Sequence, residues 1–188
     1  MPSLALVAPP GGTPEAELIR DILVTGSAEK LSVEAEALLM IASRTEHVQK
    51  VIAPALQRGA IVLCDRFSDS TLVYQGLAHD LAMDNIVGIH EFGFGDLRPD
   101  LTFLMDVPAE LGLQRAGQRQ IAEGGQPSAA ESRFEDKGIE FHQRVRSGFL
   151  ALADKYKERI VIIDASQSAE HSDLQVKKHI INKLPDDL

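Results

Sequence analysis

The sequence predicts an α/β protein in which a parallel sheet is flanked by helices. Four short runs, residues 4–8, 60–64, 101–107 and 160–163, are apolar on successive positions rather than on alternate ones. Strands that helices cover on both faces have this continuous apolar character. Helical patterns lie between and after the runs, and such an alternation of strand and helix is typical of a parallel sheet.

The helical patterns cover residues 14–24, 32–57, 82–92, 108–121, 137–156 and 170–184. The first is expected to begin at Thr13, because Thr13 offers a side-chain acceptor, Pro14 a preset backbone angle and Glu15 an acid for the first turn. Gly59 stands between the second pattern and the second apolar run, where a glycine commonly ends a helix.

Length and composition indicate one globular domain over residues 1–188. Hydrophobic residues make up 44% of the chain and charged residues 25%, which is the balance of a soluble protein. The net charge of -9 and the pI near 5.1 argue against binding to nucleic acid or to a membrane surface, because both need a broad basic face. Any anionic ligand must therefore be met by individual arginines.

The single cysteine, Cys64, lies inside an apolar run. It allows no intramolecular disulfide, and a buried structural thiol in a reducing cytoplasm is expected. The first residues carry no positive charge and too few apolar residues for an export signal or a membrane span. These features predict a cytoplasmic protein.

Functional residues are expected where the apolar runs end, because ligands of open parallel sheets bind beyond the carboxyl ends of the strands. The candidate segments are residues 8–13, 65–75 and 106–108, together with Asp164. In the second segment Asp65 and Arg66 leave the strand and a polar run follows. Charged side chains that directly follow a buried strand need partners. An ion pair between Asp65 and Arg66 that caps the strand is therefore the structural alternative to a functional role for these two residues.

The whole run from Cys64 to Gly76 closely resembles the signature of the thymidylate kinase family, in which Asp-Arg-Tyr/Phe is followed by a Ser/Thr pair and Tyr-Gln-Gly. Four more segments resemble the family in the same order along the chain: Pro10-Gly11-Gly12-Thr13-Pro14, residues 98–108, Phe141-His142 with Val145-Arg146, and residues 159–165. The resemblance therefore covers almost the whole chain.

The resemblance implies an enzyme that transfers the γ-phosphate of ATP to dTMP and gives dTDP for dTTP biosynthesis. It implies a P-loop nucleoside monophosphate kinase-like fold, a requirement for ATP and Mg²⁺, and a homodimer. It also implies roles for three residues near the phosphates. Arg66 binds the dTMP phosphate with its bidentate fork, Arg44 lies at the thymine and the phosphate, and Asp65 lies near the magnesium and the transferring phosphate.

Further residues match the family at the base and the sugar. Tyr74 and Gln75 match residues near the sugar and base, and Ser70 matches a hydroxyl close to the base. Met40 and Arg44 are four residues apart and share a helix face, although the family more often has Phe at the position of Met40. A thioether can pack on a ring; the alternatives are a core residue at Met40 and a solvated helix position at Arg44.

Residues 115–135 resemble the lid that closes over ATP with arginines. Arg115, Arg119 and Arg133 are its candidates, and Arg133 is a catalytic candidate together with Asp65 and Arg66. Phosphoryl transfer depends on neutralising spread negative charge, which gives lid arginines a task. Because Arg115 and Arg119 are four residues apart, a solvated helical stripe is the alternative for this pair.

One part of the family pattern is missing. Thymidylate kinases begin with a strand, a Gly-x-x-x-x-Gly-Lys-Ser/Thr loop and a helix, but the first residues here resemble the second strand of the family and no such loop is present. The family sheet has the order second, third, first, fourth, fifth. The sheet is therefore expected to open between residues 60–64 and 101–107, and the chain is expected to fold poorly unless that slot is filled.

Three interpretations follow from the missing loop. The first is a thymidylate kinase whose recorded sequence starts late, so that this chain is inactive alone. The second is an inactive nucleotide-binding remnant, which the replacement of the usual Arg-Glu before Pro-Gly-Gly by Ala8-Pro9 would favour. The third is a fragment that needs a separate P-loop segment. The intact run at residues 65–76 favours retained dTMP binding, provided that the missing strand or a substitute completes the fold.

Overall fold

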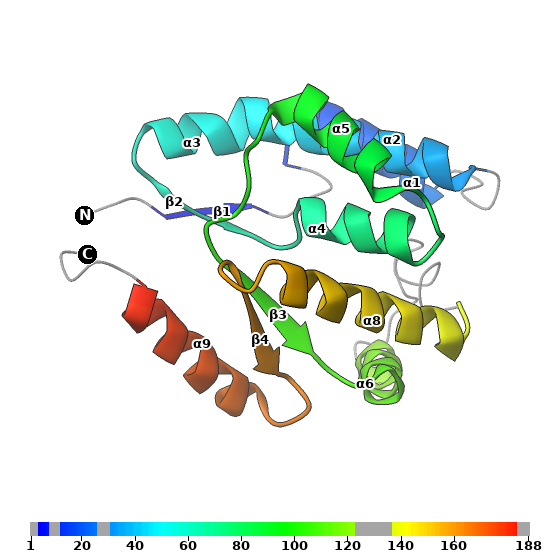
Figure 1. Ribbon diagram of the computed structural model, residues 1–188, viewed down its shortest axis with the longest axis vertical. Coiled ribbons are helices and arrows are strands. Elements are labelled where there is room, and N and C mark those ends of the chain that lie inside the picture. The colour runs from blue at the N-terminus through cyan, green and yellow to red at the C-terminus, as the bar shows by residue number, and fades with distance from the viewer. Residues whose placement is uncertain (1–3, 8–11, 26–30, 123–136, 184–188) are drawn as a thin grey trace. The chain divides into compact units, whose positions relative to one another are not determined.

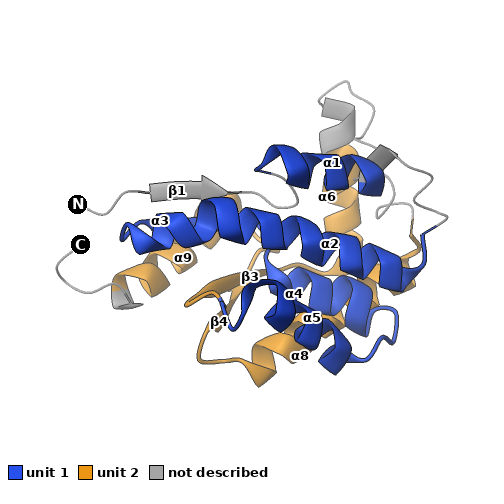
Figure 2. Cartoon of the chain, turned by 90° about the horizontal axis from the view of Figure 1, so that it is seen from above, with its two compact units in different colours: residues 1–98 blue, residues 99–188 orange. Residues whose placement is uncertain are grey.

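The computed structural model describes residues 4–7, 12–25, 31–122 and 137–183. Its contacts divide the chain into two compact units, Met1–Arg98 and Pro99–Leu188, which Figure 2 draws in blue and orange. A single domain over residues 1–188 stays a prediction. No helix within the described ranges is long and apolar enough to cross a membrane.

The first unit is built on strands β1 (Leu4–Val7) and β2 (Ile61–Cys64), which run parallel with Leu4 opposite Ile61 and Val7 opposite Cys64. Its helices include α1 (Pro14–Thr25), α2 (Val33–His47), α3 (Ala53–Gln57), α4 (Ser68–Thr71) and α5 (Met83–Phe94), which Figure 1 labels. Helix α2 contacts both α1 and α5.

The long helix expected at residues 32–57 is confirmed as a continuous helical segment made of α2, the π-helical turn η2 (Val48–Ile52) and α3. Ser32 caps its start, because its Oγ accepts a hydrogen bond from the Ala35 N–H at 3.2 Å. The widened turn precedes Pro54, whose ring has no N–H to donate and crowds the preceding helical turn. Gly59 follows with a φ of +74°, the left-handed backbone that ends many helices.

The segment after β2 forms a helix that the sequence does not predict. Helix α4 continues into a second π-helical turn, η3 (Leu72–Leu77), in which the Ala78 N–H donates to the Val73 carbonyl at 2.9 Å. The four residues of α4 are Ser, Asp, Ser and Thr, which favour caps and turns over helix interiors, so no helical pattern is visible. Both α4 and η3 contact α2.

The core of the first unit lies on one face of β2. Val62 and Cys64 pack against a buried cluster made of Val48, Ile52 and Phe67. Ile61 and Leu63 alternate with them along the strand, and these two residues are 37% and 50% exposed. The expectation that this strand is covered on both faces is therefore wrong, because the described helices of this unit cover the Val62 and Cys64 face alone.

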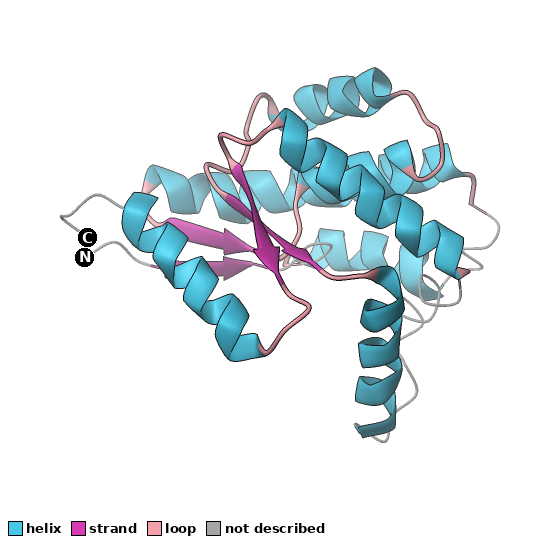
Figure 3. Cartoon of the chain, turned by 60° about the horizontal axis from the view of Figure 1, so that its bottom comes forward, coloured by secondary structure: helices cyan, strands magenta, loops and turns pink. Residues whose placement is uncertain are grey.

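The second unit is built on β3 (Thr102–Asp106) and β4 (Ile160–Asp164), which run parallel with Thr102 opposite Ile160 and Asp106 opposite Asp164. Its helices are α6 (Ala109–Ala122), α8 (Ile139–Lys155) and α9 (Ala169–Lys183) among the described residues. Figure 3 shows the strands in magenta; α8 contacts both β3 and β4, and α9 contacts β4. The buried apolar residues of α8 and β4 include Phe141, Val145, Leu152, Ile160 and Ile163.

Strand pairing in the described part of the chain joins β1 to β2 and β3 to β4, and no ladder joins β2 to β3. The expected break between the second and third apolar runs is thus confirmed. All four predicted strands and six predicted helices are found near their expected bounds. The carboxyl ends of β2, β3 and β4 therefore remain the places to look for function.

Candidate functional site

The carboxyl end of β2 has a strained backbone. Asp65 and Arg66 follow the strand with exposed side chains, and Arg66 has a φ of +67°. Non-glycine residues rarely adopt this left-handed region, and such strain clusters at functional sites. The Arg66 guanidinium lies 5.3 Å from the centre of the Tyr74 ring. Within the described residues it forms no ion pair with Asp65, so the structural alternative for this pair is wrong.

Cys64, the last residue of β2, supports the turn at Arg66. Its Sγ–H donates to the Arg66 carbonyl at 3.2 Å. Burial raises the pKa of the thiol to about 11, so the sulfur keeps its proton at neutral pH and acts as a donor. The side chain is half-buried rather than fully buried as expected, and its role is structural.

Arg44 of α2 is a buried cation. The residue is 3% exposed, its Nη1 donates to Thr71 Oγ1 at 2.8 Å, and its guanidinium lies 5.7 Å from the centre of the Phe67 ring. Its Nε has no hydrogen-bond partner among the described residues. Burial lowers the pKa of Arg44 to about 10, so the side chain is still charged at neutral pH. The alternative of a solvated helix position is therefore wrong.

A second hydrogen bond joins the same two helical segments. Gln75 Nε2 in η3 donates to Glu36 Oε1 in α2 at 2.6 Å, and the two residues are 2% and 8% exposed. Sequence reasoning missed both Glu36 and Thr71. Spacing could have indicated Glu36, because Glu36, Met40 and Arg44 recur every four residues along one face of α2. Thr71 lies inside the recognised run but matched no expected role.

The other residues expected at the base and sugar lie on the same elements. Met40 is half-buried on α2, one turn from Arg44. Ser70 in α4 and Tyr74 in η3 are also half-buried. The structure thus brings residues of α2, of the β2 end and of the α4 and η3 segment to one region of the first unit. Whether Met40 packs on a base or in the core stays a prediction.

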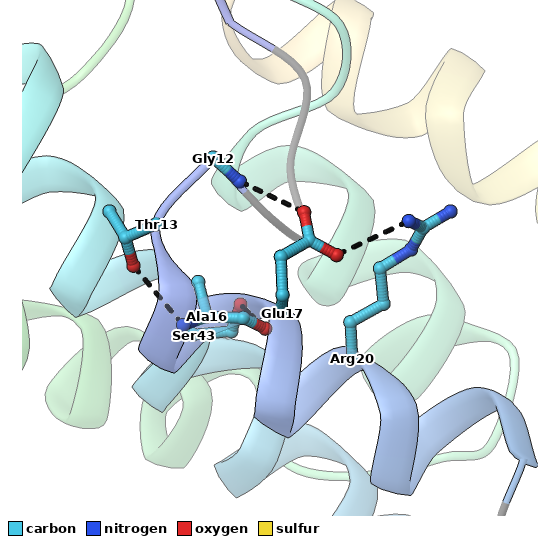
Figure 4. A network of polar contacts seen from close by, with 6 residues as sticks. All are labelled: Gly12, Thr13, Ala16, Glu17, Arg20 and Ser43. Carbon is cyan, nitrogen blue, oxygen red and sulfur yellow. Dashed lines mark hydrogen bonds and ion pairs between the residues drawn. The ribbon is translucent and has the colours of Figure 1, made fainter.

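The Pro-Gly-Gly-Thr loop ends in a network of polar contacts at the start of α1 (Figure 4). The Gly12 N–H donates to Glu17 Oε1 at 3.2 Å, and Arg20 Nη1 lies 3.4 Å from Glu17 Oε2. Thr13 Oγ1 accepts from the Ala16 N–H at 3.1 Å, which confirms the expected helix start at Thr13.

Two residues of α2 hold this loop near Arg44. Ser43 Oγ donates to the Ala16 carbonyl at 3.5 Å. His47 packs so closely that a Cβ on Gly12 would lie 2.8 Å from its Nε2, and Gly12 has a φ of +90°. Glycine has no Cβ, so it tolerates both the close contact with His47 and the positive φ without strain. Burial, followed by the nearby charge of Arg44, lowers the pKa of His47, so the imidazole is neutral at neutral pH.

Arg115 of α6, in the second unit, bonds to the chain itself. Its guanidinium donates to three carbonyls of the loop after β4: Ser166 at 2.7 Å, Gln167 at 3.0 Å, and Ala165. The alternative of a solvated stripe is therefore wrong for Arg115, and its lid role stays a prediction. The side chain of Arg119 and the whole of Arg133 lie outside the described residues.

The acids at the ends of β3 and β4 are also engaged. Arg146 donates from Nε to Asp106 Oδ1 at 2.7 Å and from Nη2 to Oδ2 at 2.8 Å, a strong bidentate arrangement. Asp164 accepts from the Ser166 hydroxyl at 2.6 Å and from Gln167 Nε2 at 2.9 Å. These bonds, with one from the Ser166 N–H, lower the pKa of Asp164 to about 2. Both acids therefore hold neighbouring segments of the second unit.

Asp65 has the chemistry that a magnesium ion needs here. Mg²⁺ is usually held by one or two carboxylates together with substrate phosphates and water. The described residues contain no group of three or more acids, histidines or cysteines that could hold a metal ion by themselves. The exposed carboxylate of Asp65, at the strand end, fits an ion that phosphate oxygens help to bind.

Comparison with known proteins finds relatives that match this chain over most of its length. The thymidylate kinase family model matches residues 2–176. Thymidylate kinases from Caulobacter vibrioides and Pseudomonas fluorescens are each 43% identical to this chain, over 93% and 96% of its length and 80% of their own. The solved thymidylate kinase from Ehrlichia chaffeensis has a TM-score of 0.71 and 31% identity, and the match covers 95% of this chain and 80% of that one.

These matches extend over both compact units and include the run at residues 64–76. The expected fold class is confirmed by the structural likeness. The alternative of an inactive remnant is not favoured, because relatives this similar are thymidylate kinases. The chain has a parallel α/β fold and an Asp-Arg motif at the end of β2, and it is 43% identical to a thymidylate kinase over 93% of its length. It therefore belongs to the thymidylate kinase family.

Proposed function

We propose that this chain binds dTMP beside the carboxyl end of β2 and takes part in transfer of the γ-phosphate of ATP to it, giving dTDP for dTTP biosynthesis. Arg44 supports this site best. It is a buried cation whose hydrogen bonding, within the described residues, is limited to the neutral Thr71 hydroxyl. The buried acid Asp69 offsets part of this charge, and a bound phosphate adds a second anionic partner in a protein of net charge -9.

Arg66 is the second proposed phosphate ligand. A guanidinium offers two parallel donors that match two phosphate oxygens. The left-handed backbone at Arg66 sets the direction of the side chain, and the contact with the Tyr74 ring restricts its rotation. An arginine that is already oriented loses little conformational freedom when it binds.

The base and sugar are proposed to lie between α2 and the α4 and η3 segment. Met40 packs on the base from α2. Ser70 and Tyr74 contact the base and sugar from the other side, and the amide of Gln75 bonds to the polar edge of the base. Support comes from the half-buried positions of Met40, Ser70 and Tyr74 and from the contacts that join these elements.

ATP is the proposed phosphate donor, with Arg115, Arg119 and Arg133 as lid residues that neutralise charge on the transferring phosphate. Arg115 has to leave the three carbonyls that it binds after β4 in order to do so. Asp65 is the proposed magnesium ligand, and Mg²⁺ supplies neutralisation of the phosphate oxygens when it is bound.

The polypeptide of these 188 residues is proposed to have no appreciable kinase activity alone. It contains no Gly-x-x-x-x-Gly-Lys-Ser/Thr sequence, whose amides and lysine cradle the ATP phosphates in P-loop enzymes. A coupled assay of ADP release with dTMP, ATP and Mg²⁺ measures this. Robust turnover would contradict the proposal and require another phosphate cradle in the chain.

A cytoplasmic homodimer is the proposed state of assembly. An apolar groove lies between α2 and α5, with Leu38, Leu81, Ile86 and Ile89 among its lining residues. Leu38 is 51% exposed, and grouped apolar surface of this kind is typical of interfaces. Sedimentation velocity distinguishes a dimer from a monomer.

Calorimetry with dTMP and thymidine tests the phosphate role of Arg66. Arg66→Ala is expected to weaken dTMP binding by about thirtyfold or more, because loss of one partner of a charged hydrogen-bonded pair costs about 2–5 kcal/mol. Thymidine has no phosphate, so its binding should not change. Arg58→Ala, an exposed arginine after α3, is the matched control. An equal loss for both ligands would mean that Arg66 supports the fold, and no loss for either would mean that its phosphate role is wrong.

A further inference from the structure

We propose that Phe67 is a positioning residue of the dTMP site, because its ring holds the Arg44 guanidinium in the orientation that binds the nucleotide, and that Phe94 of α5 supports this ring. Helix α5 then affects the affinity for dTMP although it is not itself a ligand. This inference rests on the proposed dTMP site, and it adds the residues that prepare the buried cation for an anionic ligand.

The Arg44 guanidinium has an aromatic partner on its face. Its central carbon lies over the Phe67 ring, 5.7 Å from the ring centre, which is within the range of about 6 Å over which an aromatic face attracts a cation. Arg44 is 3% exposed and Phe67 is 8% exposed, so water screens this attraction little. A desolvated pair of this kind is stronger than one at the surface.

One short segment after β2 surrounds the guanidinium. Phe67, which directly precedes α4, meets its face, and Thr71, the last residue of α4, accepts a hydrogen bond from Nη1 at 2.8 Å. Burial lowers the pKa of Arg44, and the buried acid Asp69 of the same helix acts in the opposite direction. A contact on the face and a bond at the edge restrict the rotation of a planar group. An arginine that is already oriented loses less conformational entropy when it binds.

The Phe67 ring is held in turn by α5. The centres of the Phe67 and Phe94 rings are 5.5 Å apart and the ring planes make an angle of 51°, a geometry in which aromatic rings attract each other. Gly93 allows α5 to approach α2 this closely, because a Cβ at that position would clash with Thr45 Oγ1. Thr45 directly follows Arg44, so the packing of α5 and the position of the cation are fixed at adjacent residues of α2.

Phe67 also belongs to the buried cluster of the first unit, together with Val48 and Ile52. Replacing it therefore lowers stability whatever its effect on the ligand. A purely structural role and a positioning role differ in one respect: positioning requires the guanidinium of Arg44. The test therefore compares the same substitution with and without that guanidinium.

The test is a double-mutant cycle of Phe67→Leu and Arg44→Met in the whole chain, with dTMP affinity measured by NMR titration, which reaches weak binding. Phe67→Leu should weaken dTMP binding about fivefold, the equivalent of about 1 kcal/mol and the cost of ordering one long side chain. In the Arg44→Met background the same substitution should change the affinity by less than about twofold, because no guanidinium remains to be positioned. Phe67→Tyr keeps the ring face and should bind dTMP as the parent does.

Phe94→Leu provides a second route that spares the buried cluster. It should weaken dTMP binding by about twofold to threefold, and again only while Arg44 is present. Phe103→Leu is the matched control, since it makes the same change at a half-buried position of β3 in the second unit. It should lower stability and leave dTMP affinity unchanged.

Equal losses from Phe67→Leu with and without Arg44 would overturn the inference and leave Phe67 a residue of the core. If Phe67→Leu does not fold, the cycle with Phe94→Leu decides in the same way. No loss from either variant, in a parent chain that binds dTMP, would show that this inference alone is wrong. If the parent does not bind dTMP, the proposed site is wrong as well.

Discussion

Arg44 in the first unit and Arg146 in the second illustrate two ways in which this chain uses an arginine. Arg44 is 3% exposed and, among the described residues, donates one hydrogen bond, to a neutral hydroxyl. Arg146 is partly exposed and makes a bidentate pair with Asp106. Water and a carboxylate therefore satisfy the charge of Arg146. The buried charge of Arg44 is shielded from water and, among the described residues, makes no such bidentate pair, although the buried acid Asp69 raises its pKa. An anionic ligand would complete its hydrogen bonding.

The same difference separates the acids at the strand ends. Asp106 and Asp164 hold neighbouring segments through Arg146, Ser166 and Gln167. Asp65 is exposed after β2 and has no hydrogen bond or ion pair to another described residue. Polar groups of the second unit thus maintain its loops, whereas the Asp65 carboxylate after β2 is exposed. A resemblance to a family does not distinguish these two uses.

The largest expected effect comes from replacing each arginine by methionine. Arg44→Met should weaken dTMP binding by about 2–5 kcal/mol, because the phosphate then meets no buried cation. Its free energy of unfolding should fall by less than about 2 kcal/mol, because methionine removes the cost of burying the guanidinium but leaves the buried Asp69 without this cationic neighbour. Calorimetry and urea unfolding measure the two quantities.

Arg146→Met is the matched control in the second unit. It should lower stability by about 1 kcal/mol, the value of a partly exposed ion pair with favourable geometry, and leave dTMP affinity unchanged. Loss of dTMP binding in Arg146→Met, or severe unfolding in Arg44→Met, would break the distinction between the two arginines.

A smaller effect is expected from acid, and it should be greatest in the first unit. His90 of α5 is 1% exposed, and burial, more than the nearby Arg44, lowers its pKa from 6.5 to about 4. Between pH 4 and pH 6.5, His90 binds a proton in the unfolded chain but not in the folded chain. Stability present above pH 6.5 is therefore lost as the pH falls toward 4, by up to about 3 kcal/mol.

Urea unfolding at a series of pH values measures this loss, and hydrogen exchange of α5 and α8 assigns it to a unit. His90→Leu should show a smaller loss over the same interval, because leucine does not titrate. Equal pH dependence in the parent and the variant would show that His90 is not the source.

The smallest effects are expected from one glycine in each unit. A Cβ on Gly93 of α5 would clash with Thr45 Oγ1, which donates to the Ile41 carbonyl at 2.9 Å. Gly93→Ala should therefore lower stability by about 1 kcal/mol. At Gly117 of α6 no atom of the described residues lies within 4 Å of such a Cβ, and Gly117→Ala should raise stability by about 0.5–1 kcal/mol. Thermal unfolding measures the change in stability of each variant. Changes of the same sign in both variants would contradict this difference in packing.

Sequence reasoning succeeded where a signal is local. The apolar runs, the helical periodicity of residues 32–57, the cap at Thr13 and the glycine at position 59 lie within a few residues of the structures they specify. The helix made of α4 and η3 was missed because its first residues favour turns when judged by themselves. Contacts of this segment with α2 outweigh that preference, and local propensity carries no information about such contacts.

The sequence by itself determined the α/β class, the order and bounds of the elements, and the family, because periodicity and motifs are properties of neighbouring residues. Tertiary structure alone decided what the side chains meet: Arg44 and Thr71 are 27 residues apart, Glu36 and Gln75 are 39 apart, and Arg115 and Ser166 are 51 apart. Burial and hydrogen bonding of a side chain depend on these distant partners. The same residue type can therefore be a buried cation at Arg44 and a brace for a loop at Arg115.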